Sequence, residues 1–192
     1  MAIRLPSLVQ VASTLWSGDT ALDLPDLHRY YDTRKAKAAE RAELQRKGLS
    51  EGELADHIKK QEAEVEALRL KCEDDLRKLT VSRETGDYSK ILKAGEPPTW
   101  FKFRIIPGTL MREFQNELIT ESIANFKIPA LAFRIALVGI DGLDGVRVDM
   151  EDDKHYGRIA KSDIVDSLDA IDAGIVNELG NFALSRSFPK AV

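Results

Sequence analysis

The sequence predicts an α+β fold that is mostly helical. We expect an N-terminal helical hairpin, or coiled-coil arm, followed by a small domain with a two-stranded sheet and three to four helices. Charged residues make up 31% of the chain, above the usual value of about 25%, which is typical of a long exposed helix. Apolar residues recur with a 3.5-residue period over residues 54–79, as in a coiled coil. From residue 100 onward the pattern changes to strand-like alternation and short apolar helices.

Residues 1–24 are predicted to be a short N-terminal amphipathic segment that ends in a turn at Gly18. The apolar residues at helical spacing are Leu5, Leu8, Val9, Ala12 and Trp16. This spacing predicts one short helix. Its apolar face has two interpretations: it packs on the protein's own body, or it docks on a partner. Trp16 would then be the anchor, because tryptophan is enriched at interface hot spots.

The charged helical hairpin is expected over residues 25–82. Pro25 fixes the entry of the first helix, and a glycine follows its end at Lys47. A capping box at Ser50 opens the second helix, which is expected to run as one piece to about Val81. Because the connection is short, the two helices must be antiparallel neighbours.

The second helix carries the predicted coiled-coil seam. Its apolar positions, at alternating four- and three-residue steps, are Leu54, Ile58, Val65, Leu68, Cys72 and Leu79. Gln61 and Asp75 occupy two polar positions in this seam. Because the first helix has only a thin apolar face, we expect part of the seam to contact another chain. The candidate partner-binding residues are Leu54, Ile58, Val65, Leu68, Leu79 and Trp16.

Residues 83–99 are rich in glycine and proline and are predicted to be a linker. A compact α+β domain is expected over 100–184, and a tail over 185–192. The clearest strand is Trp100 to Ile106, with Phe101, Phe103 and Ile105 on one face. We expect its partner at Val146 to Met150.

Helices are predicted between and after these two strands. The first runs from Thr109 to about Asn125, and the second runs from Pro129 to about Gly139. The last helical region begins at Ser162 or Asp163. Gly174 and Gly180 weaken it, so one helix or two short ones remain open.

The sequence contains no recognisable catalytic, cofactor or metal motif. His28, His57 and His155 lie far apart, without partners at the spacing of a metal site, and solvated imidazoles are expected. The acidic loop 149–155 lacks the spacing of a calcium loop, which indicates an exposed acidic turn. Cys72 is expected to be a small core residue. We therefore expect no enzyme activity, no cofactor and no metal ion.

Charge and hydropathy also bear on the partners. The formal net charge is −4, whereas a protein that binds duplex nucleic acid needs a positive excess. No stretch approaches the roughly 20 apolar residues that span a bilayer. The single cysteine fits a reducing compartment. We expect protein partners in the cytoplasm, or in a particle assembled there, and neither nucleic acid nor a membrane.

Three segments of the last half of the chain carry a resemblance. They are WFKFRIIPGTLMREF (100–114), FRIALVGIDGLDG (133–145) and IVNELGNFALSRS (175–187). Together they resemble small morphogenesis proteins of tailed bacteriophages, especially tail assembly chaperones. The resemblance implies stoichiometric protein binding without turnover, in the host cytoplasm or the virion. The implied partners are phage structural proteins or further copies of the chain, in a homo-oligomer or a larger assembly. The helical arm departs from the chaperone pattern and fits a head or tail accessory protein as well.

Two other classes stay open. A bacterial cytoplasmic coiled-coil adaptor would form a small defined oligomer through the seam. An enzyme or ligand-binding domain without a recognisable motif would need a pocket with converging polar groups, expected near Asp149 to His155.

Overall fold

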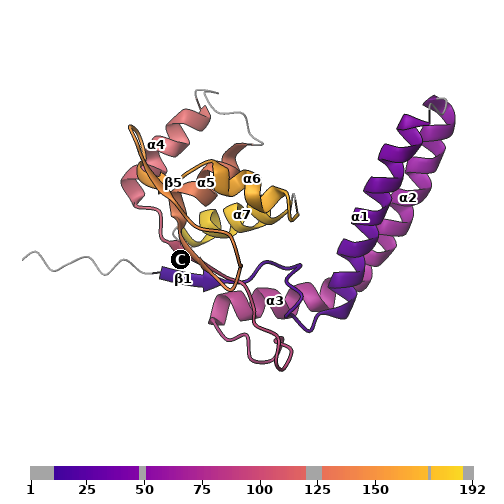
Figure 1. The fold of residues 1–192 in the computed structure, drawn as a ribbon, viewed down its shortest axis with the longest axis horizontal. Helices are drawn as coiled ribbons and strands as arrows, with labels where there is room; N and C mark the ends of the chain where they lie inside the picture. Colours follow the sequence, from indigo (N-terminus) through magenta and orange to yellow (C-terminus); the bar gives the residue numbers. More distant parts are fainter. Residues whose placement is uncertain (1–10, 48–50, 120–126, 173, 188–192) are drawn as a thin grey trace, which may run out of the picture. The chain divides into compact units, whose positions relative to one another are not determined.

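The computed structural model describes residues 11–47, 51–119, 127–172 and 174–187. Over these residues the chain is α+β and mostly helical, with seven helices and two small antiparallel sheets. Contacts divide the chain into two compact units (Figure 1). We call Ser17–Pro98 the helical unit, and Met1–Trp16 with Thr99–Val192 the sheet unit.

The helical unit contains α1 (Pro25–Arg46), α2 (Glu51–Lys71) and α3 (Glu73–Thr85). Helices α1 and α2 lie side by side as a hairpin (Figure 1), and α1 has nearly the predicted bounds. The predicted capping residue Ser50 lies outside the described residues. The prediction of one helix from residue 51 to 81 is wrong, because a turn at Cys72 separates α2 from α3. The seam positions keep the same spacing on both sides of that turn, so the periodicity of the sequence does not reveal where the helix breaks.

The helical unit buries its apolar side chains at one end, which we call the base. These residues are Ala21, Leu22, Leu24, Leu27, Cys72, Leu79, Tyr88 and Ile91. Two short segments pair there, because Asp23 N donates to Ile91 O at 2.7 Å and Lys93 N donates to Ala21 O at 2.8 Å. The region predicted as a linker at 83–99 therefore contains part of α3 and two buried side chains of the base.

Beyond the base, the hairpin has a different interior. We call residues 28–47 and 52–71 the distal hairpin. Among its described residues no apolar side chain is fully buried, and the one buried side chain is Gln61, at 2% exposure. The distal hairpin is therefore held by polar contacts rather than by an apolar core.

The larger sheet of the sheet unit has the strand order β1–β2–β3, all antiparallel. Its strands are β1 (Val11–Thr14), β2 (Trp100–Arg104) and β3 (Leu137–Asp141). The helix predicted within residues 1–24 is wrong where the structure describes it, because Val11–Thr14 form strand β1. Residues 1–10 lie outside the described residues. The helix predicted to reach Gly139 is also wrong, because the chain changes from helix to strand at Leu137.

The predicted strand pairing is wrong as well. Strand β2 pairs with β1 and β3, and not with Val146 to Met150. The second sheet is a hairpin of β4 (Met150–Asp153) and β5 (Gly157–Ala160). Strand β3 pairs with the edge of β2 at which the prediction had placed Val146 to Met150.

The remaining helices cover the sheet unit. They are α4 (Gly108–Ile119), α5 (Ile128–Ala136), α6 (Asp163–Asp169) and α7 (Ile175–Ser187). The last helical region is thus two helices, with the break before Gly174. Helix α5 packs against α7. A Cβ atom added at Gly180 would lie only 2.0 Å from the carbonyl oxygen of Pro129, so the absence of a side chain permits this close approach.

The core of the sheet unit is apolar. Phe101 and Phe103 are each 2% exposed, as the strand alternation predicts. The ring of Phe103 meets that of Phe133 edge to face, with centroids 5.7 Å apart. Ile105, expected on the same face, lies beyond the end of β2 and is 37% exposed.

Candidate protein-interaction surface on the helical hairpin

A buried carboxylate fixes the start of α1. Asp75 is 4% exposed, and its Oδ2 accepts hydrogen bonds from Asp26 N at 3.1 Å and Leu27 N at 3.3 Å. Leu24, at the N-cap position, supplies no side-chain cap. Asp75 therefore accepts hydrogen bonds from two backbone N–H groups in the first turn of α1, although it lies 49 and 48 positions away from them in sequence. Lys78 Nζ lies 3.1 Å from Asp75 Oδ1 and balances the charge of the carboxylate.

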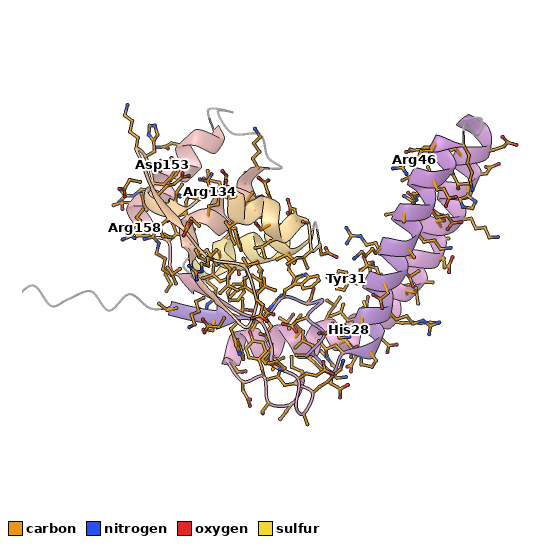
Figure 2. All side chains as sticks on the ribbon, in the orientation of Figure 1. His28, Tyr31, Arg46, Arg134, Asp153 and Arg158 are labelled. Carbon is orange, nitrogen blue, oxygen red and sulfur yellow. The ribbon has the colours of Figure 1, made fainter. Side chains whose placement is uncertain are left out.

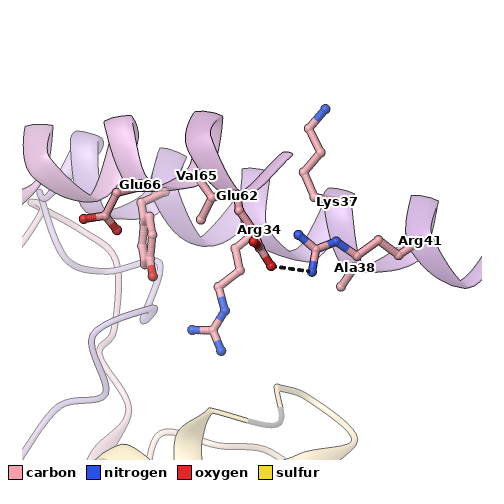
Figure 3. Close-up of a pocket in the computed structure, with 8 residues that line it drawn as sticks. Arg34, Lys37, Ala38, Arg41, Glu62, Val65 and Glu66 are labelled. Carbon is pink, nitrogen blue, oxygen red and sulfur yellow. Dashed lines mark ion pairs between the residues drawn. The ribbon is translucent and has the colours of Figure 1, made fainter. Parts of the chain in front are cut away.

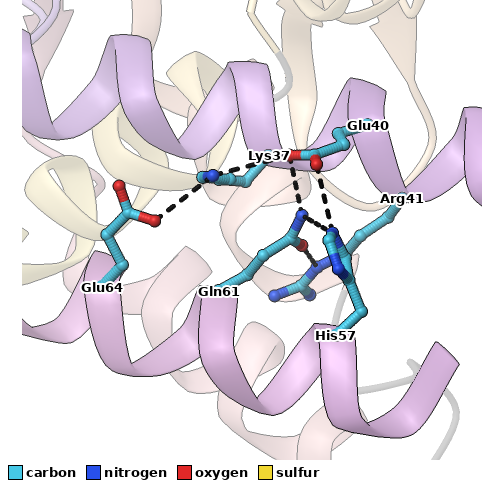
Figure 4. Close-up of polar contacts among 6 residues, drawn as sticks. All are labelled: Lys37, Glu40, Arg41, His57, Gln61 and Glu64. Atoms are coloured by element: carbon cyan, nitrogen blue, oxygen red, sulfur yellow. Dashed lines mark hydrogen bonds and ion pairs between the residues drawn. The ribbon is translucent and has the colours of Figure 1, made fainter. Parts of the chain in front are cut away.

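A polar layer joins the middle of α1 to the middle of α2 (Figure 4). Gln61 is its centre. Its Nε2 donates to Glu40 Oε2 at 2.9 Å, and its Oε1 accepts from Arg41 Nε at 2.7 Å. A buried side-chain amide without partners would be costly, so these bonds tie the register of the two helices to Gln61.

His57 completes the polar layer. Its Nε2 lies 3.1 Å from Glu40 Oε1 and 3.0 Å from Gln61 Nε2. One ring nitrogen cannot donate to the carboxylate and accept from the amide at the same time. The tautomer of His57 therefore decides which of the two contacts is a hydrogen bond. The imidazole keeps 37% of its side-chain surface exposed, in line with the predicted solvated ring, and it also takes part in the interhelical contact.

Charges flanking the layer shift two pKa values. The hydrogen bond from Lys37 to Glu64, with an N–O distance of 3.2 Å, raises the pKa of Lys37. Burial acts to raise the pKa of Glu40, but the hydrogen bond with His57 and the charge of Lys37 outweigh it and lower that pKa. Both shifts favour the charged forms, so the layer is an ionic contact between the helices at neutral pH.

A groove of about 430 Å³ runs between the helices (Figure 3). We call it the hairpin groove. It is lined by Tyr30, Arg34, Lys37, Ala38, Arg41, Glu62, Val65 and Glu66. Figure 3 shows Arg34 reaching out from α1, whereas Lys37 points to the opposite side of the helices. Arg41 pairs with Glu62 at 3.8 Å across the groove.

The predicted candidate residues fall into three places. Leu54, Ile58, Val65 and Leu68 are half-buried on α2, and Val65 lines the hairpin groove. Leu79 is 1% exposed and belongs to the base. Trp16 is half-buried and packs against the apolar core of the sheet unit. The structure therefore brings only part of the predicted set to an accessible surface.

The charged groove residues were not among the predicted ones. Arg34 and Arg41 are seven residues apart on α1, and Glu62 and Glu66 are four apart on α2. Either spacing places two side chains on one helix face. The signal was therefore present, but it lay within long runs of mixed charge that are typical of a solvated helix.

Cys72 is free and buried, which confirms the predicted small core residue. Its Sγ lies 3.1 Å from Arg69 O. Burial raises the pKa of the thiol, so the reactive thiolate form is disfavoured at neutral pH.

The acidic loop 149–155 directs its side chains to separate partners. Asp153 is labelled in Figure 2. Its Oδ1 accepts hydrogen bonds from the backbone N–H groups of His155 at 2.8 Å and Tyr156 at 2.9 Å. These bonds lower the pKa of Asp153. Across the described parts of the chain, no group of three or more His, Cys, Asp or Glu side chains is placed to hold a metal ion.

Two further acidic side chains of the loop, Glu151 and Asp149, form ion pairs, and Asp149 also borders a small concavity. Glu151 forms an ion pair with Arg134, and Asp149 Oδ2 lies 4.0 Å from Lys161 Nζ. The concavity has about 170 Å³, which is smaller than the roughly 300–1,000 Å³ of ligand pockets. It is lined by Gly145, Val146, Arg147, Asp149, Lys161, Asp163, Ile164 and Ser167.

None of the helices in the described ranges is both long and apolar enough to cross a bilayer. The chain matches no protein-family profile, no curated protein and no solved structure.

Proposed function

We propose that the chain is a non-catalytic protein-binding component of a larger assembly, and that the distal hairpin is its contact element. One observation carries this proposal: among the described residues of the distal hairpin, no apolar side chain is fully buried. Helices in globular proteins gain most of their stability from packing an apolar face. A hairpin that lacks such packing is completed by contact with another protein.

The ion pairs of the hairpin are a weak substitute for packing. Lys47–Glu43 and Arg69–Glu66 are both solvent-exposed pairs, and such pairs contribute about 0–1 kcal/mol each. The half-buried seam residues, in contrast, gain roughly 25 cal/mol for each Å² of apolar surface that a partner covers. Association therefore offers the distal hairpin more stability than its own surface charges do.

For the kind of assembly, we propose a tailed-bacteriophage particle or its assembly pathway. The resemblance of residues 100–187 to phage morphogenesis proteins supports this, and the long helical hairpin suits a head or tail accessory protein that braces neighbouring subunits. On this proposal the chain works in the host cytoplasm or in the virion. A bacterial coiled-coil adaptor is the second candidate, because the same hairpin would serve it.

Fractionation of phage-producing cells tests the assembly class. Lysate from cells that make the chain and release tailed particles is separated by density gradient, and the chain is followed by immunoblot. A structural component is expected in the purified particles, and a chaperone is expected only in incomplete assemblies. Absence from both fractions, with the chain in a small discrete complex, would replace the phage proposal with the adaptor.

Charged substitutions test the contact element. Val65→Lys with Leu68→Lys should lower the solution mass or the helicity, because two half-buried seam positions become charged. The matched control is Leu70→Lys, which changes an α2 side chain that is already 55% exposed. Light scattering and far-UV circular dichroism measure the two effects. A double variant with the mass and helicity of the parent chain would exclude the seam as a contact surface.

A further inference from the structure

The two walls of the hairpin groove carry opposite charges. Arg34 and Arg41 stand on the α1 wall, and Glu62 and Glu66 stand on the α2 wall. Glu66 also forms an ion pair with Arg69 of its own helix at 2.8 Å, so a second arginine at Glu66 would share that carboxylate. The groove also exposes an apolar strip formed by Tyr30, Ala38 and Val65. Among the residues drawn in Figure 3, Arg41 pairs with Glu62, whereas no ion pair joins Arg34 to any of the others. The groove thus has a positive side, a negative side and an apolar centre.

This pattern selects among possible occupants. A nucleic acid or an acidic peptide would be attracted by the α1 wall and repelled by the α2 wall, and a basic peptide would meet the reverse. A ligand with one positive and one negative edge is complementary to both walls. Because the groove itself has one positive and one negative edge, it is complementary to a second groove that faces it with the edges exchanged.

We propose that the hairpin groove is occupied by the hairpin groove of a second copy of this chain, so that two hairpins form a four-helix bundle. This inference rests on the proposed function, because it names the partner of the same contact element. The interface is isologous: each contact of one copy with the other occurs twice.

The wall charges also fix the symmetry axis. Two hairpins can face each other across a two-fold axis that is parallel or perpendicular to the helices. A perpendicular axis would place α1 opposite α1 and bring Arg34 and Arg41 toward like charges. A parallel axis places α1 of each copy opposite α2 of the other, so opposite charges meet and all neighbouring helices are antiparallel. The parallel axis also brings both hairpin tips to the same end of the bundle.

A two-fold axis parallel to the helices places each residue of one copy at the same height along the bundle as the same residue of the other copy. Arg41 lies across from Glu62 within one copy, so it also meets Glu62 of the partner subunit. Arg34 is about 10 Å from that level along α1, and Glu66 is about 6 Å from it along α2. The difference of about 4 Å is within the reach of an arginine side chain, so Arg34 pairs with Glu66 of the partner subunit.

The size of the face predicts a weak, tunable dimer. Helix α1 has 22 residues and therefore spans about 33 Å, and two adjacent helices are about 20 Å wide. The face of the hairpin that meets the second copy therefore has an area of roughly 700 Å². This is near the lower limit for specific interfaces, at about 600–800 Å² a side. We therefore expect a dissociation constant in the micromolar range, rising with salt because the charged walls are screened.

Charge reversal tests the pairing. Arg34→Glu and Glu66→Arg should each weaken the full-length dimer at least tenfold, because each places like charges at both symmetric contacts. An equimolar mixture of the two variants should restore it as a heterodimer, since both contacts then join opposite charges. Sedimentation equilibrium of each variant and of the mixture measures this. The matched control, Lys35→Glu, reverses an exposed α1 charge outside the groove residues and should dimerise like the parent chain.

The outcomes separate this inference from the proposed function. A parent chain that stays monomeric at several hundred micromolar, or variants that dimerise unchanged, would overturn self-pairing. Particle fractionation tests the proposed function independently, because a monomeric chain can still enter a particle through another protein. Circular dichroism establishes that each variant is folded, so loss of the dimer cannot be mistaken for loss of the hairpin.

The axis has its own test. A spin label on Arg46→Cys, an exposed position near the tip, reports the distance between copies by double electron–electron resonance. A parallel axis predicts about 15–25 Å, and a perpendicular axis predicts more than about 30 Å, because the tips would lie at opposite ends. A distance in the longer range would overturn the proposed arrangement.

Discussion

The sheet unit and the distal hairpin are stabilised by different kinds of interaction. In the sheet unit, aromatic and aliphatic side chains from β2, α5 and α7 form a continuous buried core. In the distal hairpin the buried position is a glutamine surrounded by charges. Apolar burial responds little to salt and to mild acid, whereas ionic contacts respond to both. The two units should therefore lose their structure under different conditions.

The two tryptophans allow the units to be followed separately. Trp16 and Trp100, the only tryptophans in the chain, both belong to the sheet unit. Tryptophan fluorescence therefore reports the sheet unit, while far-UV circular dichroism is sensitive to the long helices α1 and α2.

The largest effect is expected from Phe103→Ala. Phe103 is 2% exposed, and its ring contacts those of Phe133 and Phe182. Removing a buried phenylalanine side chain costs about 3–5 kcal/mol of unfolding free energy. Denaturant titration followed by tryptophan fluorescence should show this loss, while Ile105→Ala, at a position 37% exposed, should cost much less. Equal stability of the two variants would contradict the core assigned here.

A smaller loss is expected from Gly180→Ala. The added methyl group would lie 2.0 Å from Pro129 O and 2.5 Å from Pro129 C, so α7 must move away from α5. Overpacking of this kind costs about 1–3 kcal/mol. Gly139→Ala is the matched control, because its Cβ would lie 3.7 Å from a lysine side chain, an ordinary contact. A Gly180→Ala variant with the same melting temperature as the parent chain would contradict the close approach of α5 and α7.

The next effect concerns the base of the helical unit. Asp75→Ala should cost about 0.5–2 kcal/mol, the usual loss when a helix cap is removed. Hydrogen exchange should accelerate at the amides of Asp26 and Leu27, which donate to Asp75. Asp74→Ala is the control, because Asp74 is exposed and forms surface ion pairs with Arg77 and Lys78. Unchanged exchange at both amides in Asp75→Ala would exclude the long-range cap.

Local signals in the sequence predicted several elements well. Pro25 placed the start of α1, and the alternation of Phe101 and Phe103 predicted β2 with the correct buried face. The pairing of β2 failed because residues 128–140 are mostly apolar, with Arg134 the one charged residue, and helix changes to strand at Ala136–Leu137 without a glycine or proline at the junction. Periodicity cannot locate such a change in a short apolar run.

The polar exceptions in the predicted seam were more informative than its apolar positions. Gln61 and Asp75 interrupted the repeat, and the structure makes them the centre of the polar layer and the cap of α1. Their partners lie 21 and 48 residues away in sequence, so neither contact is visible as a local motif. Positions that break a local pattern are where tertiary polar contacts are expected. The charged walls of the hairpin groove were hidden for the same reason, because α1 and α2 meet only after folding.

The smallest predicted effect is the acid response of the distal hairpin. The folded-state pKa of Glu40 is lowered, because the His57 hydrogen bond and the Lys37 charge outweigh burial. Its contribution to stability is therefore complete above the unfolded pKa of about 4.3 and is lost as the pH falls through the lower folded pKa. Far-UV circular dichroism should record partial loss of helicity below about pH 4. Tryptophan fluorescence, which reports the sheet unit, should not follow this transition. Glu40→Gln should flatten this part of the titration, whereas Glu43→Gln, which removes the same charge outside the polar layer, should leave it in place. Identical acid titrations for the parent chain and Glu40→Gln would mean that the polar layer does not couple the two helices.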